Sequence, residues 1–111
     1  MCSNPQTLSL ANGNLYMGHQ VFDTYFPSIN SVILLSKPPL ILIMPVHSAG
    51  AGGLLLKIRN SLGDRVVNVS EFFQKLGIDI TAERVVYAQW NSEYSALTFS
   101  LEDWFSAMLD P

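Results

Sequence analysis

The sequence predicts a single α+β domain, with a mostly antiparallel sheet of about six strands and two helices. Its length of 111 residues is typical of one domain with one hydrophobic core. Several short runs of β-branched, aliphatic and aromatic residues are separated by turn-forming residues, which is the pattern of strands. Two other stretches space their apolar residues as amphipathic helices do. We therefore expect residues 1–111 to form one domain, with an internal boundary at the glycine loop 47–53.

Strands account for most of the predicted elements. A β-hairpin is expected around Asn12 and Gly13, because both residues tolerate the positive φ angles of a tight hairpin turn. Residues 23–31 contain Pro27 and predict a loop or one helical turn. The predicted strands cover residues 9–22 as a hairpin, 32–35, 40–44, 54–59, 65–69, 84–90 and 94–100.

Residues 54–59 ("LLLKIR") alternate as a half-buried strand should, with successive side chains on opposite faces. One face would carry Leu54, Leu56 and Ile58. The other would carry Leu55, Lys57 and Arg59. A turn at residues 60–64 would then lead into the strand 65–69.

Two helices are predicted in the second half of the chain. Ser70 can cap the first, whose last turn is marked by Lys75 and by Gly77 just beyond it. The second begins after Ser100, and its apolar residues recur at the spacing of one helical stripe. We expect this C-terminal helix to pack on the sheet. The residues of its stripe that we predict to form an interface are Trp104, Phe105 and Met108.

The composition favours contact with another protein. Hydrophobic residues make up 49% of the chain and charged residues only 14%, so a monomer has few polar groups to cover its surface. The formal net charge of -3 argues weakly against binding to nucleic acid, which usually requires a basic surplus. No apolar run is long enough to span a membrane, and no secretory signal is visible. We expect a cytoplasmic protein.

No motif predicts a metal or a cofactor. His19 and His47 have no second histidine or cysteine at ligand spacing. The glycine loop 47–53 precedes a strand, whereas phosphate-binding loops precede a helix. His47 and Ser48 lie beside this loop and are the residues that we would place in a small-ligand pocket.

Residues 54–100 resemble SpoVT/AbrB-type swapped-hairpin domains and MazE-like antitoxins. The resemblance is carried by "RVVNVSEFFQKLGI" (65–78), which follows "NSLG" (60–63) and precedes a pair of strands. In that family two chains interleave into a dimer, and basic residues of the first hairpin approach DNA. The resemblance implies that Lys57, Arg59 and Arg65 would contact nucleic acid.

Three functional hypotheses follow. The leading one is a small non-catalytic binding or assembly module that self-associates or binds a protein partner, since no set of catalytic residues stands out. The second is a dimeric DNA-binding regulator or antitoxin that uses the three basic residues named above. The third is a small-ligand binder or an enzyme with a pocket near the glycine loop.

Overall fold

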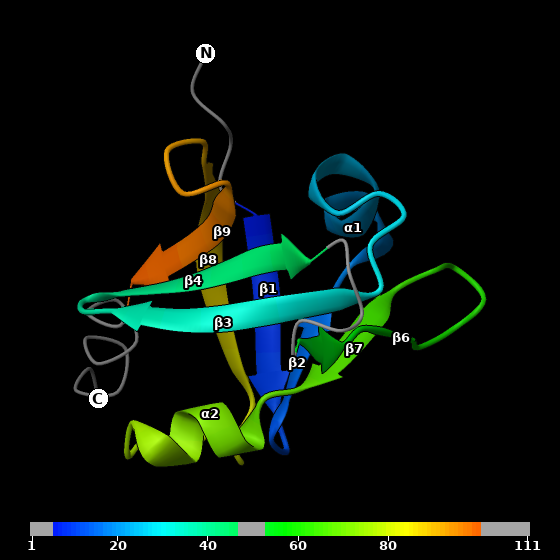
Figure 1. The fold of residues 1–111 in the computed structure, drawn as a ribbon. Helices are drawn as coiled ribbons and strands as arrows, with labels where there is room; N and C mark the ends of the chain where they lie inside the picture. Colours follow the sequence, from blue (N-terminus) through cyan, green and yellow to red (C-terminus); the bar gives the residue numbers. More distant parts are fainter. Residues whose placement is uncertain (1–5, 47–52, 101–111) are drawn as a thin grey trace.

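The computed structural model describes residues 6–46 and 53–100 of the chain. Within these ranges it contains nine strands and two helices (Figure 1). The strands are β1 (Gln6–Ala11), β2 (Asn14–Met17), β3 (Ser31–Lys37), β4 (Leu40–Val46), β5 (Leu54–Leu55), β6 (Lys57–Ile58), β7 (Arg65–Asn68), β8 (Arg84–Asn91) and β9 (Ala96–Ser100). The helices are α1 (His19–Tyr25) and α2 (Ser70–Lys75).

The expected α+β fold class is wrong, because the described chain is mostly strand. All nine strands join one antiparallel sheet that is nearly closed into a barrel, and the helices have only seven and six residues. A sheet that curls on itself covers its own apolar face, so helices are needed only where the curled sheet is open. The C-terminal helix that the sequence predicts to pack on the sheet lies outside the described residues.

One stretch of chain joins the two ends of the sheet. The strand order is β5-β3-β4-β9-β8-β1-β2-β7-β6, with β5 paired to β3 and β6 paired to β7. Only Leu56 separates β5 from β6, so residues 54–58 act as a closing strand between β3 and β7. The backbone N–H of Leu56 donates to the carbonyl of Asn30 at 2.7 Å, and its side chain is buried. The β5 half of the closing strand is therefore held by contacts distant in the sequence, whereas the β6 half pairs with the nearby strand β7.

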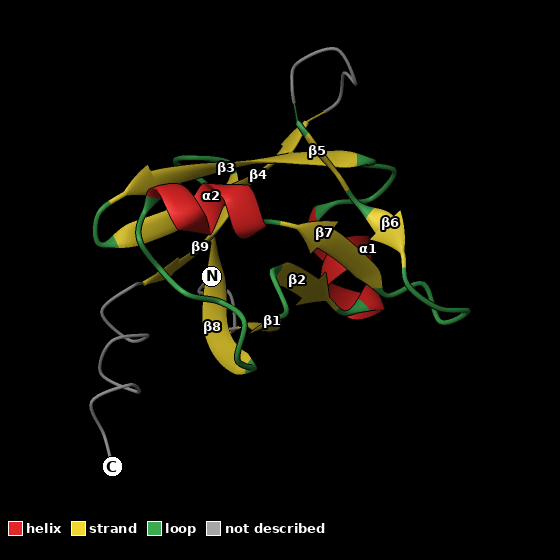
Figure 2. Ribbon diagram, turned by 90° about the horizontal axis from the view of Figure 1, so that it is seen from below, coloured by secondary structure: helices red, strands yellow, loops and turns green. Residues whose placement is uncertain are grey.

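The core lies between two walls of the curled sheet. Figure 1 shows β3 and β4 crossing in front of β1 and β8, and the turned view in Figure 2 places these pairs on opposite sides of the interior. Leucine side chains of β1 and isoleucine side chains of β4 belong to one buried cluster. Phe26, just after α1, and Phe73 of α2 are fully buried in the same cluster. The two helices therefore cover different ends of one core.

The predicted hairpin at Asn12 and Gly13 is confirmed. These residues have φ angles of 54° and 80°, and the turn joins β1 to β2. A Cβ at position 13 would lie 3.0 Å from the Cβ of Ser70, so this position needs glycine for space as well as for conformation. The hairpin ends at Met17, however, and the helix α1 takes the place of its predicted continuation to residue 22.

The closing strand departs from the predicted alternation. Leu56 is buried, but Ile58, which was expected on the same face, is 69% exposed. The reason is that the strand is interrupted at Leu56, where the chain leaves its pairing with β3 and begins its pairing with β7. Side chains on the two sides of this interruption no longer follow one pleat.

The remaining strand and helix predictions in the described part of the chain are largely confirmed. β3 and β4 extend the predicted runs 32–35 and 40–44, and β8 and β9 form the second predicted hairpin. Helix α2 begins at the predicted Ser70, but this residue does not cap it. The N-cap is Val69, and the side-chain oxygen of Asn68 accepts hydrogen bonds from the backbone N–H and hydroxyl of Ser70.

Among the described residues, no helix has both the length and the apolar character that a membrane crossing requires. The glycine loop, apart from Gly53, lies outside the described residues. So do the predicted pocket residues His47 and Ser48 and the predicted interface residues Trp104, Phe105 and Met108.

Candidate protein-binding surface

Exposed apolar side chains gather on the closing strand and on the loop that follows it. In the described part of the chain, seven large hydrophobic side chains are exposed, and Leu55, Ile58 and Leu62 are three of them. They are 56%, 69% and 69% exposed. Isolated exposed hydrophobic residues are common, and Val85 and Tyr87 form another exposed pair on β8. Leu55, Ile58 and Leu62 are three such residues within eight positions of the chain, so we treat them as a candidate contact site.

Positive charge gathers on the same element. Lys57 and Arg59 are exposed, and with Arg65 they place three of the chain's six Lys and Arg residues within nine positions. The Arg59 guanidinium carbon lies 4.4 Å from the centre of the Tyr16 ring, and that of Arg65 lies 3.8 Å from the centre of the Phe22 ring. We call the exposed set Leu55, Lys57, Ile58, Arg59 and Leu62 the hairpin surface.

The loop that supports the hairpin surface is anchored to helix α1 by Asp64. One oxygen of its carboxylate accepts the backbone N–H of His19 at 2.8 Å and lies 3.0 Å from Nδ1 of the same histidine. The other oxygen accepts the side-chain amide of Asn60 at 2.9 Å. These hydrogen bonds, of which that from Asn60 has the largest effect, lower the pKa of Asp64 from 3.8 to about 2.

The loop is also closed by its own hydrogen bonds. The backbone N–H of Arg59 donates to the carbonyl of Asp64 at 2.7 Å, and that of Gly63 donates to the carbonyl of Asn60 at 3.1 Å. The Asn60 side-chain oxygen accepts the N–H of Leu62 at 3.0 Å. Arg65 donates back to the carbonyl of Gly63. These hydrogen bonds order the loop between β6 and β7, and an ordered loop loses less conformational entropy when it forms a contact.

Two adjoining grooves border the closing strand. The first, of about 400 Å³, is lined by Asn14, Leu54, Leu55, Lys57, Val66 and Asn68. The second, of about 550 Å³, is lined by Val32, Ile33, Leu34, Leu54, Asn68, Ser70, Glu71, Phe72 and Lys75. Leu54 and Asn68 line both grooves. The first groove thus lies beside Leu55 and Lys57 of the hairpin surface.

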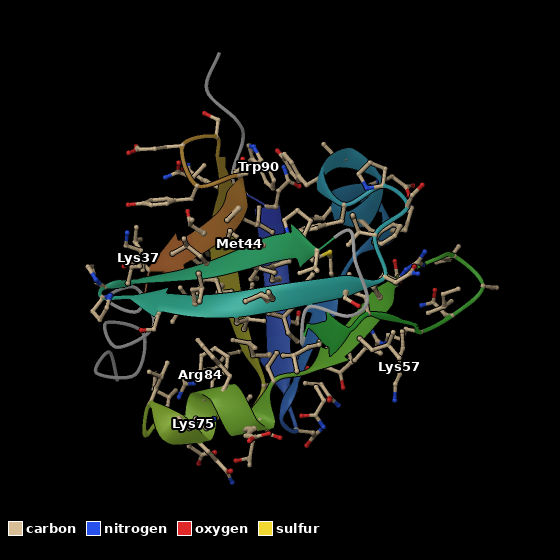
Figure 3. All side chains as sticks on the ribbon, viewed as in Figure 1. Lys37, Met44, Lys57, Lys75, Arg84 and Trp90 are labelled. Atoms are coloured by element: carbon tan, nitrogen blue, oxygen red, sulfur yellow. The ribbon has the colours of Figure 1, made fainter. Side chains whose placement is uncertain are left out.

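The structure brings together the basic residues that the sequence singles out. Lys57 lies on β6, Arg65 begins β7, and Arg59 leads into the loop between them. They are not equivalent. Lys57 and Arg59 are exposed, whereas Arg65 is partly buried between the Phe22 ring and the carbonyl of Gly63. Figure 3 shows Lys57 projecting away from the sheet.

Sequence reasoning missed the contacts between α1 and the loop. The hydrogen-bond partner of His19 is Asp64, 45 residues away in the sequence, so no local spacing links the two. The stacking of Arg59 on Tyr16 and of Arg65 on Phe22 was also missed. The only local signal is the pair Asn60 and Gly63, which is typical of a tight turn that could orient an aspartate next to it.

Among the described residues, no group of three or more His, Cys, Asp and Glu side chains could hold a metal ion. Comparison of the chain with protein-family models, with curated proteins and with solved structures found no match.

Proposed function

We propose that this chain is a non-catalytic assembly module that self-associates through the hairpin surface. The observation that carries this proposal is the placement of Leu55, Ile58 and Leu62 around the cations Lys57 and Arg59 on a pre-shaped hairpin. The low charged fraction of the whole chain supports it as well.

The apolar side chains supply most of the affinity in this proposal. Burying one Leu or Ile side chain in an interface contributes roughly 1.5–3 kcal/mol, and each 1.4 kcal/mol is about tenfold in a dissociation constant. An exposed ion pair contributes about 0–1 kcal/mol. Ile58 and Leu62, the most exposed of the apolar group, should therefore be its most sensitive positions.

Sedimentation velocity over a range of protein concentrations tests the proposal. We expect reversible self-association of the wild-type chain, and an increase of about tenfold or more in the dissociation constant for Ile58→Ser combined with Leu62→Ser. The matched control is Val85→Ser combined with Tyr87→Ser on β8, where the side chains are 53% and 63% exposed. This control should associate as the wild type does. A strict monomer at every concentration, or an effect of the β8 variant alone, would refute the proposal.

We propose DNA binding as the second candidate function, favoured by the gathering of Lys57, Arg59 and Arg65 on one hairpin. The net charge of -3 counts against it. In the same protein preparations, binding to duplex DNA that weakens steeply with salt and is lost in Lys57→Glu combined with Arg59→Glu would favour this candidate. Absent or salt-insensitive binding would dispose of it.

A further inference from the structure

We infer that the hairpin surface of one copy binds residues 101–111 of a second copy of this chain. This inference rests on the proposed self-association and names the segment that occupies the hairpin surface. It is argued from the chemistry of the two sequences and from the position of Ser100, where β9 ends.

The two surfaces are complementary in charge and alike in apolar content. The hairpin surface offers the cations Lys57 and Arg59, and Asp64 beside them is already engaged by His19 and Asn60. Residues 101–111 ("LEDWFSAMLDP") contain no Lys or Arg. Their carboxylates are Glu102, Asp103 and Asp110, and their large apolar residues are Leu101, Trp104, Phe105, Met108 and Leu109.

The strand register places the first carboxylates of this segment too far from the hairpin surface of their own chain. Ser100 pairs with Leu40, which pairs with Lys37 at one end of β3. Leu55 pairs with Ser31 at the other end of β3. Six residues of strand separate these ends, which is about 20 Å at about 3.3 Å per residue.

Glu102 and Asp103 follow Ser100 by two and three residues, so they can move at most about 7–11 Å from it along the chain. Figure 1 likewise shows the end of β9 and the loop after β6 on opposite sides of the molecule. These two carboxylates can therefore meet Lys57 and Arg59 only when the cations belong to another copy. For Glu102 and Asp103, the strand register therefore favours a contact between chains over a contact within one chain.

The charges and the apolar side chains have different tasks in this contact. Exposed ion pairs add little affinity and weaken as salt rises, but they select a partner of opposite charge. Burial of Ile58 and Leu62 against the apolar residues of the segment supplies the affinity. Arg59 is favourable for this role because its guanidinium is already oriented by the Tyr16 ring.

A charge exchange between full-length chains tests the inference. The first variant is Lys57→Glu with Arg59→Glu, and the second is Glu102→Lys with Asp103→Lys. Each variant alone should self-associate at least tenfold more weakly than the wild type, because like charges then face each other. An equimolar mixture should associate with an affinity near that of the wild type, since both contacts are again between opposite charges. Sedimentation velocity measures all three samples.

The matched control for the second variant is Glu83→Lys with Glu93→Lys. It changes the net charge by the same amount, but at two exposed carboxylates outside residues 101–111. It should leave self-association unchanged, and circular dichroism should show that every variant folds. If the second variant associates as the wild type does, or if mixing restores nothing, the inference fails. The proposed function then still stands provided that Ile58→Ser with Leu62→Ser weakens association.

A crosslinking experiment locates the contact directly. A photoreactive amino acid at position 58, in a mixture of ¹⁴N- and ¹⁵N-labelled chains, should give mixed-isotope crosslinks to peptides from residues 101–111. Crosslinks between copies that join position 58 to another region would contradict the inference and leave self-association established.

Discussion

At the scale of single residues, Asp64 joins two parts of the fold that lie far apart in the sequence. Its carboxylate links the loop after β6 to the first residue of α1, whose N-cap Gly18 has no side chain to offer. The carboxylate thus does for α1 what a local capping residue does for other helices. The hydrogen bonds from Asn60 and His19 favour the ionised form, which lowers the pKa of Asp64 to about 2.

This lowered pKa gives a pH-dependent prediction. Because the folded pKa lies below the ordinary value of 3.8, ionised Asp64 stabilises the folded state fully above about pH 4, and the effect is lost as the pH falls towards about 2. Asp64→Ala should therefore lower the urea midpoint at pH 7, and the difference from the wild type should narrow between about pH 4 and about pH 2. Asp23→Ala, at an exposed carboxylate of α1, should change the midpoint little. An equal loss at both ends of this range would contradict the prediction.

At the scale of elements, the closing strand contributes one side chain to the core and exposes another at the surface. Leu56, at the interruption, contributes to the core, and Ile58, two residues later, faces outward. A regular strand would place both side chains on one face. Because of the interruption, the same short stretch completes the sheet and leaves the side chain of Ile58 exposed.

Alanine substitutions at these two positions should therefore differ strongly. We expect Leu56→Ala to reduce the free energy of unfolding by about 2–5 kcal/mol, because it leaves a cavity in the core. Ile58→Ala should change the free energy of unfolding by about 0.5 kcal/mol or less under conditions in which the chain is monomeric. Urea unfolding measures both. Similar losses for the two variants would mean that the strand is regular and that Ile58 is buried.

At the scale of the whole molecule, the core is shared by elements that lie far apart in the sequence. Phe73 from α2 and Phe26 after α1 belong to the same buried cluster. Trp90 of β8 stacks on Tyr25 of α1, with 5.2 Å between ring centres, and packs against the same core. A change at the α2 end should therefore affect the stability that is detected at the α1 end.

Phe73→Ala tests this coupling. We expect it to reduce the free energy of unfolding by about 3–5 kcal/mol. Far-UV circular dichroism and the indole NMR signal of Trp90 should report the same shifted urea transition, because one core unfolds as a unit. Gln74→Ala, at the exposed neighbouring position, is the control, and it should leave the urea transition unchanged in both signals. Two separate transitions would show that the ends of the sheet unfold independently.

The sequence predicted the parts of the fold that depend on near neighbours. Asn12 and Gly13 specify a tight hairpin because few residues tolerate positive φ angles, and this holds whatever surrounds them. The short apolar runs that form β3 and β4 could also be recognised from neighbouring residues alone. For the candidate surface, the sequence singled out Lys57, Arg59 and Arg65 but could not say that Arg65 would be partly buried.

The closure of the sheet was decided only by the tertiary structure, and several other features depend on that closure. The place of α1, the burial of Leu56 and the pairing of His19 with Asp64 all require segments that are tens of residues apart to meet. Local patterns report which face of a strand is apolar, but they do not report whether a helix or the opposite wall of the same sheet will cover it. Here the opposite wall covers it, because the closing strand brings the two ends of the sheet together.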